Sequence, residues 1–175
     1  MSTTIPPIVV MGVQGAGKST IGTLLADRIG AAFVDGDRLH SPENVAIMAA
    51  GRPLTDRERE PWLREVGRVL AENRGSGIVI ACSALKRRYR DLLRASVPEL
   101  FVVYPEGSIE LVSARIGART HEFMPAGLLQ SQFDTLEPLE ADERGVTVDI
   151  ALSPPQIIDE IAAAIGVAGE VRRAD

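Results

Sequence analysis

Cysteine, lysine and long apolar runs are scarce in this sequence of 175 residues. Its one cysteine, Cys82, excludes an internal disulfide framework. No basic stretch followed by a long apolar segment suggests a secretion signal or a membrane span, so we expect a cytoplasmic protein that does not bind a membrane. The formal net charge of −5 argues against a nucleic-acid partner held by a broad basic face.

Only two lysines, Lys18 and Lys86, occur among the nineteen basic residues. Neither stands in an Asn/Thr-Lys-x-Asp motif, so the sequence lacks the base-reading signature of a GTP-dependent switch. In a chain that otherwise uses arginine, each lysine marks a position where a small, rotatable ammonium could be required. For Lys86, a solvated place on a helix surface is an equally good interpretation.

The apolar runs are short, rich in β-branched residues and separated by helical patterns. They cover residues 8–11, 31–34, 78–82, 100–104 and 146–150. This alternation predicts an α/β fold with a parallel sheet and helices on both faces, and the length fits a single domain over residues 1–175. Capping boxes at Thr55–Glu58 and Ser153–Gln156 mark two helix starts, whereas Pro61 predicts that the first of these helices begins or kinks near it.

A glycine-rich loop follows the first apolar run. Residues 12–19 match the G-x-x-x-x-G-K-[ST] pattern, and a helical pattern over residues 20–29 comes after them. A strand, a glycine loop and a helix in this order aim backbone N–H groups and a helix N-terminus at one point, which suits a polyphosphate. We therefore predict a nucleoside triphosphate site, in which Lys18 reaches the β- and γ-phosphates and Ser19 offers its hydroxyl to Mg²⁺.

Two aspartates follow the second apolar run, at the strand ends where ligands of an open parallel sheet collect. Asp35 and Asp37 are two residues apart, so an extended chain would put both carboxylates on one face. Beside a Mg²⁺-triphosphate we expect Asp35 to hold the metal's water shell and Asp37 to orient or deprotonate an attacking hydroxyl. A tight Asp-Gly hairpin turn is the alternative.

Further polar residues are candidates for contacts with an acceptor substrate. His40 either contacts the substrate or packs locally, and Arg59 either grips a carboxylate bidentately or belongs to a solvated helix face. A short lid is expected around residues 119–126, with Arg115 and Arg119 as arginines that stabilise the γ-phosphate, unless both are solvated. Other candidate substrate contacts are Lys86, Arg90 and His121.

Five segments carry a resemblance to a known family. They are Gly12 to Ser19, Asp35-Gly36-Asp37-x-x-His40, Pro53-Leu54-x-Asp56-x-x-Arg59-x-Pro61-Trp62-Leu63, Cys82-Ser83-Ala84-Leu85-Lys86-x-x-Tyr89-Arg90 and Ser131-Gln132-Phe133-x-x-Leu136-Glu137. Together they resemble the bacterial gluconate kinases of the small P-loop type, over about residues 8–166. The resemblance implies phosphorylation of D-gluconate at its 6-hydroxyl by ATP and Mg²⁺. It also implies a shikimate- and adenylate-kinase-like fold with a five-stranded parallel sheet, commonly as a homodimer.

Carried over by position, the resemblance assigns ATP binding to Gly12, Val13, Gln14, Gly15, Ala16, Gly17, Lys18, Ser19 and Thr20. It places Arg115 and Pro154 beside the adenine and makes Asp37 the partner of the gluconate hydroxyl. Together with the arguments from the glycine loop and the lid, the expected catalytic residues are Lys18, Asp37 and Arg119. Glu122 departs from the aromatic or small residue expected in the lid. Two related kinases fit less well, because shikimate kinases carry a glycine triplet where this chain has residues 82–84, and adenylylsulfate kinases lack the Pro-Trp-Leu segment.

Overall fold

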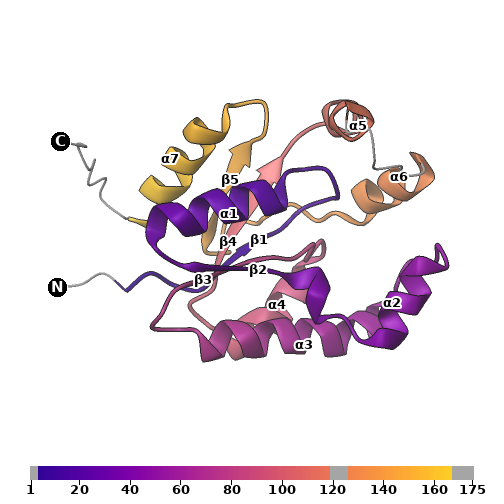
Figure 1. Cartoon of the computed structure of the whole chain (residues 1–175), viewed down its shortest axis with the longest axis horizontal. Coiled ribbons are helices and arrows are strands. Elements are labelled where there is room, and N and C mark those ends of the chain that lie inside the picture. The colour runs from indigo at the N-terminus through magenta and orange to yellow at the C-terminus, as the bar shows by residue number, and fades with distance from the viewer. Residues whose placement is uncertain (1–3, 119–125, 167–175) are drawn as a thin grey trace.

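The computed structural model describes residues 4–118 and 126–166, and a five-stranded parallel sheet lies at its centre (Figure 1). The strands are β1 (Ile8–Val10), β2 (Ala32–Asp35), β3 (Ile78–Ala81), β4 (Phe101–Glu106) and β5 (Gly145–Asp149). Their spatial order is β2-β3-β1-β4-β5, and all four neighbouring pairs are parallel. The α/β class and the five strands predicted from the sequence are confirmed.

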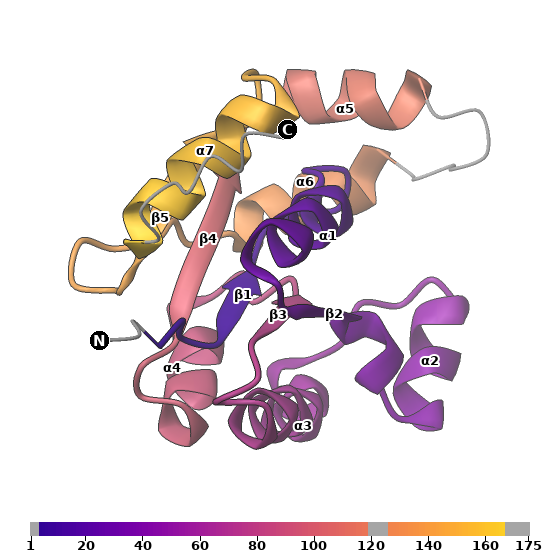
Figure 2. The ribbon, with the colours of Figure 1, turned by 60° about the vertical axis from the view of Figure 1, so that its left-hand side comes forward.

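Helices cover both faces of the sheet (Figure 2). They are α1 (Lys18–Ile29), the 3₁₀ helix η1 (Gly36–Leu39), α2 (Pro42–Ala49), α3 (Asp56–Glu72), α4 (Arg87–Ser96), α5 (Ile109–Ala118), α6 (Ala126–Thr135) and α7 (Pro154–Ile165). Side chains alternate along β1, so Ile8 and Val10 pack with α1 and α7, while Val9 and Met11 pack with α3 and α4. No helix in the described residues is long and apolar enough to cross a membrane.

Helix α3 begins at Asp56 and continues through Pro61. The hydroxyl of Thr55 accepts a hydrogen bond from the Glu58 N–H, and the Glu58 carboxylate accepts one from the Thr55 N–H, so the predicted capping box fixes the start. A start near Pro61 is therefore excluded. Pro61 has no backbone N–H, so the helix lacks the hydrogen bond from this residue to the carbonyl four residues earlier. Beside this interruption Asn44 of α2 donates to the Glu58 carbonyl at 3.0 Å and ties α2 to the first turns of α3.

A buried ion pair holds the segment that follows β3. Arg90 and Glu143 are joined by two hydrogen bonds of 2.7 and 2.9 Å, and both side chains are fully buried. Burial would raise the pKa of Glu143, but hydrogen bonds from Arg90, Arg94 and a backbone N–H outweigh burial and lower this pKa to about 2. Arg90 also donates to the Ala84 carbonyl at 3.1 Å. Ala84 has φ of 38°, a left-handed conformation that favours glycine, so the pair stabilises a strained turn next to the site.

Candidate active site

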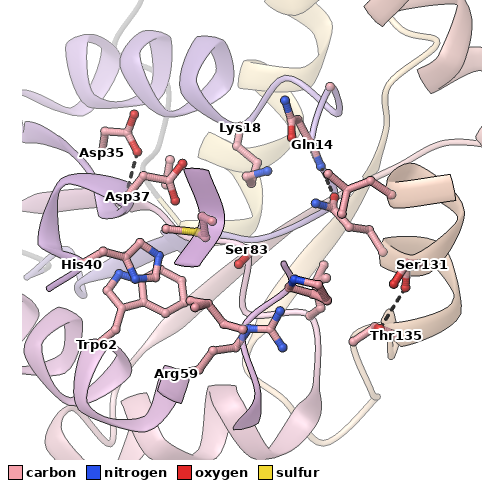
Figure 3. Close-up of a pocket in the computed structure, with 18 of the residues that line it drawn as sticks. Gln14, Lys18, Asp35, Asp37, His40, Arg59, Trp62, Ser83, Ser131 and Thr135 are labelled. Carbon is pink, nitrogen blue, oxygen red and sulfur yellow. Dashed lines mark hydrogen bonds between the residues drawn. The ribbon is translucent and has the colours of Figure 1, made fainter. Parts of the chain in front are cut away.

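A cavity lies at the carboxyl ends of β1, β2 and β3, where an open parallel sheet places its ligands. Its volume is about 520 Å³, which is within the usual range for small-molecule sites. The wall is built by the glycine loop, the first turn of α1, η1, the segment of residues 48–54, the start of α3, the segment after β3 and α6. Figure 3 labels ten of the lining residues: Gln14, Lys18, Asp35, Asp37, His40, Arg59, Trp62, Ser83, Ser131 and Thr135.

The glycine loop has the open backbone that the motif predicts. Gly15 and Gly17 have φ of 83° and 90°, which other residues rarely adopt. A Cβ at Gly15 would also lie 2.6 Å from the Ile116 side chain. Gly17 precedes α1 without a side-chain cap, so no capping oxygen blocks the first N–H groups of that helix. Ser19 and Thr20 follow on its first turn and border the same cavity.

Lys18 points into the cavity from the first turn of α1 (Figure 3). Its Nζ donates to the Val13 carbonyl at 2.9 Å, inside the loop itself. Burial lowers the pKa of Lys18, while the charges of Asp37 and Asp35 oppose that shift. Among the described residues this desolvated ammonium has only the Val13 carbonyl as a partner, and phosphate oxygens would compensate its charge better.

The two aspartates border the cavity, but they do not lie on one extended strand as the sequence suggested. β2 ends at Asp35, and the chain turns into η1, where the Asp35 carboxylate accepts the Asp37 N–H at 3.0 Å. A hairpin is excluded because β2 pairs in parallel with β3. Gly36 is required at the turn, since a Cβ there would lie 2.5 Å from the Ala81 carbonyl oxygen. The turn brings both carboxylates to the cavity side that Lys18 also faces (Figure 3).

His40 packs locally and also lines the cavity, so contact between His40 and the substrate stays a prediction. Its ring stacks on Trp62 with centroids 4.1 Å apart, and the Trp62 indole N–H donates to the Gly36 carbonyl at 2.8 Å. Burial is the main cause that lowers the pKa of His40. The charge of Asp37 opposes this shift and the charge of Arg59 adds to it, and the net lowering favours the neutral ring. The Asn44 amide nitrogen, which can only donate, lies 3.5 Å from Nδ1, so a neutral ring that accepts this bond carries its proton on Nε2.

Arg59 enters the cavity from the side opposite Lys18 (Figure 3). It is half-buried on the first turns of α3, so it does not belong to a solvated helix face. Its guanidinium lies 5.5 Å from the centre of the Tyr89 ring, and NH1 donates to the Tyr89 hydroxyl at 2.9 Å. A planar cation at this place can pair with a carboxylate in two hydrogen bonds.

Two expected substrate contacts do not fit the structure. Arg90 is fully buried against Glu143, away from the cavity wall, so the expectation that it binds substrate is wrong. Lys86 also lies outside the wall, and its ammonium bonds to Asp56 at 3.1 Å. These two ion pairs could not be predicted from the sequence, because the acidic partners of Arg90 and Lys86 lie 53 and 30 residues away in the chain.

The expected adenine and lid contacts can be placed only in part. Arg115 of α5 donates to the Ile150 carbonyl, and Ile150 lies four residues before Pro154 at the start of α7. Arg115 and the segment leading to Pro154 are thus close together, outside the wall of the 520 Å³ cavity. Arg119, His121 and Glu122 lie outside the described residues, as does the lid up to residue 125.

The polar wall residues for which the sequence suggested no role include Gln132 and Ser83. The side-chain carbonyl of Gln132 on α6 accepts the backbone N–H of Gln14 at 2.7 Å, so α6 reaches the glycine loop directly. The backbone carbonyl of Ser83 accepts the Gly12 N–H at 3.0 Å, which joins the segment after β3 to the same loop. Both stand in motifs of the resemblance, and that is the only sequence signal for them.

The residues expected to hold Mg²⁺ fit that ion. No three His, Cys, Asp or Glu side chains of the described residues cluster as a closed metal site. Mg²⁺ in phosphate sites needs only one or two protein oxygens, because water and phosphate oxygens complete its shell. The Ser19 hydroxyl and the Asp35 carboxylate are such oxygens, and both border the cavity beside the glycine loop.

Comparisons with known proteins agree with this geometry. The shikimate kinase family model matches residues 14–165. A gluconokinase from Gluconobacter oxydans is 43% identical, with 88% of each chain covered. A protein described as a probable gluconokinase from Mus musculus is 41% identical over 90% of this chain and 96% of its own. The crystal structure of a gluconokinase from Sinorhizobium meliloti is 44% identical and superposes with a TM-score of 0.87 over 95% of this chain and 94% of that one.

Proposed function

Since this chain belongs to the gluconokinase family of P-loop kinases, we propose that it transfers the γ-phosphoryl group of ATP to the 6-hydroxyl of D-gluconate, giving 6-phospho-D-gluconate and ADP. One observation of the structure supports this most strongly. A single cavity holds a phosphate loop with Lys18 on one side and a half-buried arginine, Arg59, on the other, with Asp37 between the two elements that carry them. A linear sugar acid needs a cation for its carboxylate at one end and a base beside the phosphate at its other end.

The proposed reaction assigns one task to each side chain. Asp37 accepts the proton of the 6-hydroxyl as the hydroxyl oxygen forms a bond to the γ-phosphorus. The bond from the γ-phosphorus to the bridging oxygen breaks, and its electron pair leaves with ADP. Lys18 gives up the Val13 carbonyl and stabilises the charge that develops on the phosphate oxygens.

The remaining groups bind and orient. Mg²⁺, held through Ser19, Asp35 and phosphate oxygens, would neutralise charge on the triphosphate. His40, with its proton on Nε2, offers a donor to a substrate hydroxyl, while its ring is fixed against Trp62. Arg59 takes the carboxylate. Arg119 remains the candidate for stabilising the γ-phosphate from the lid, and Arg115 with Pro154 for flanking the adenine.

Gluconate should exceed glucose by ~10²-fold or more in kcat/KM. Glucose would leave the Arg59 guanidinium desolvated and without its anion, which typically costs about 3 kcal/mol. Arg59→Met should reduce this preference at least ~10-fold, since it removes the cation and keeps much of the apolar stem. A coupled assay of ADP release with both acceptors measures the ratio.

The matched control for this prediction is Arg57→Met, because Arg57 is exposed on the same helix and lies outside the cavity wall. It should keep the preference of the parent. An Arg59→Met variant with unchanged discrimination would show that another cation reads the carboxylate. Arg52, the other arginine of the cavity wall in the described residues, would then be the next to test.

Further expectations about cofactors, assembly, location and partners belong to this proposal. Use of Mg²⁺ rests on the fit of Ser19 and Asp35, and ATP use follows from the kinase family. A homodimer and a cytoplasmic location remain predictions from the sequence. Gluconate is the small-molecule partner we propose, and we propose no nucleic-acid or membrane partner.

A further inference from the structure

The guanidinium of Arg59 is fixed by a chain of hydrogen bonds that leads away from the cavity. Arg59 NH1 donates to the Tyr89 hydroxyl at 2.9 Å, and the Tyr89 hydroxyl donates to the Asp56 carboxylate. Tyr89 is 2% exposed, so bulk water has little access to the ring and its hydroxyl. The three side chains come from the first turns of α3 and α4, which pack against each other beneath the cavity.

The direction of these hydrogen bonds follows from which of the side chains can donate a proton. A phenol has one proton to donate, and an ionised carboxylate can only accept, so the Tyr89 proton must point to Asp56 and an oxygen lone pair must face Arg59. Burial and the Asp56 contact raise the pKa of Tyr89, so the phenol keeps this proton at neutral pH. Hydrogen bonds from Tyr89 and Lys86 lower the pKa of Asp56, which keeps the carboxylate ionised.

Asp56 is itself held in place by two cations at the start of α4. Lys86 Nζ reaches both carboxylate oxygens at 3.1 and 3.3 Å, and Arg88 NH1 bonds to one of them at 3.0 Å. Asp56 is also the first residue of α3, where a helix N-terminus favours an anion. Lys86 therefore has a role that neither a solvated surface nor a substrate contact explains.

We propose that Tyr89 is a positioning residue of the acceptor site, whose hydroxyl, oriented by Asp56, holds the Arg59 guanidinium toward the cavity to receive the substrate carboxylate. The inference rests on the proposed function of Arg59. A free arginine side chain has many rotamers, and holding it in the binding geometry before the substrate arrives removes an ordering cost from the binding step. Tyr89 should thus affect affinity for the acid rather than the phosphoryl-transfer step.

Tyr89→Phe tests the inference, because it removes the hydroxyl and keeps the ring that packs in the core and faces the guanidinium. The dissociation constant of gluconate should rise about 10-fold, while kcat and the KM for ATP change less than about threefold. Binding can be followed through Trp62, the only tryptophan, which lines the cavity and stacks on His40. Tyr104→Phe is the matched control, since the only other tyrosine is buried in the same apolar cluster outside the cavity wall and should leave the affinity unchanged.

A double-mutant cycle with Arg59→Met separates positioning from a general structural effect. If Tyr89 acts through Arg59, Tyr89→Phe should have no further effect on gluconate affinity once Arg59 is methionine. Because the cycle compares dissociation constants of folded proteins, a loss of stability would lower the melting temperature without producing this coupling. Additive effects, or a Tyr89→Phe variant that binds gluconate like the parent while Arg59→Met binds it poorly, would overturn the inference. If Arg59→Met itself bound gluconate normally, Arg59 would not bind the carboxylate, and the positioning role of Tyr89 would be wrong as well. That result would not contradict the proposed kinase activity, which the acceptor-dependent release of ADP tests separately.

Discussion

Lys18→Ala should lower kcat/KM by at least ~10²-fold, which corresponds to several kcal/mol of lost electrostatic stabilisation of the transferring phosphoryl group. The structure places the Lys18 ammonium in the cavity with only the Val13 carbonyl as its hydrogen-bond partner among the described residues. Because burial lowers the pKa of Lys18, the folded protein carries an unfavourable desolvated charge there, and removing it should leave the melting temperature equal or higher. Steady-state kinetics and a thermal melt measure both parts.

Arg28→Ala is the matched control for Lys18→Ala. Arg28 lies on the same helix, and its ion pair with Asp159 is exposed to solvent, so its loss should change neither activity nor stability appreciably. A folded Lys18→Ala variant with near-normal turnover would remove Lys18 from the catalytic site.

Asp37→Asn should lower kcat by roughly 10² to 10⁴-fold with little change in ATP affinity, because it keeps the shape of the side chain and removes the base. Single-turnover kinetics and a separate measurement of ATP binding would show whether the loss lies in the transfer step or in ATP affinity. Asp35→Asn is the informative comparison, since an amide oxygen can still accept the Asp37 N–H that the carboxylate now accepts at 3.0 Å. That variant should weaken Mg²⁺-dependent ATP binding while η1 stays intact.

The same two measurements test which aspartate serves the metal and which serves the hydroxyl. If Asp37→Asn loses ATP binding as severely as turnover, Asp37 belongs to the metal and Asp35 to the hydroxyl.

The parts of the site that lie close together in sequence could be predicted from sequence. The glycine loop is built by consecutive residues between a strand and a helix, and it folds as the motif predicts. The Asp35–Asp37 pair also reaches the cavity, although the expected extended backbone is replaced by a 3₁₀ turn that Gly36 makes possible. A local pattern thus identified the residues and missed their conformation.

Contacts between distant segments could not be predicted. Arg90 was expected at the substrate, but its burial depends on Glu143, a partner that local sequence does not reveal. The same holds for Gln132, whose bond to the glycine loop spans 118 residues, and for the link from Arg59 through Tyr89 to Asp56. Charge and residue type are visible in a sequence, whereas the partner that decides between substrate binding and core packing is set by the fold.

Acceptor-dependent release of ADP is the most direct test of the proposed activity. The purified protein would be given ATP and Mg²⁺ with D-gluconate, D-glucose, shikimate or no acceptor, and the product would be identified by mass spectrometry and NMR. We predict rapid ADP release with gluconate, at least ~10²-fold less with each of the others, and a phosphate on the 6-hydroxyl of the product. ADP release that is equally fast without an acceptor, or faster with shikimate than with gluconate, would contradict a gluconate-phosphorylating function.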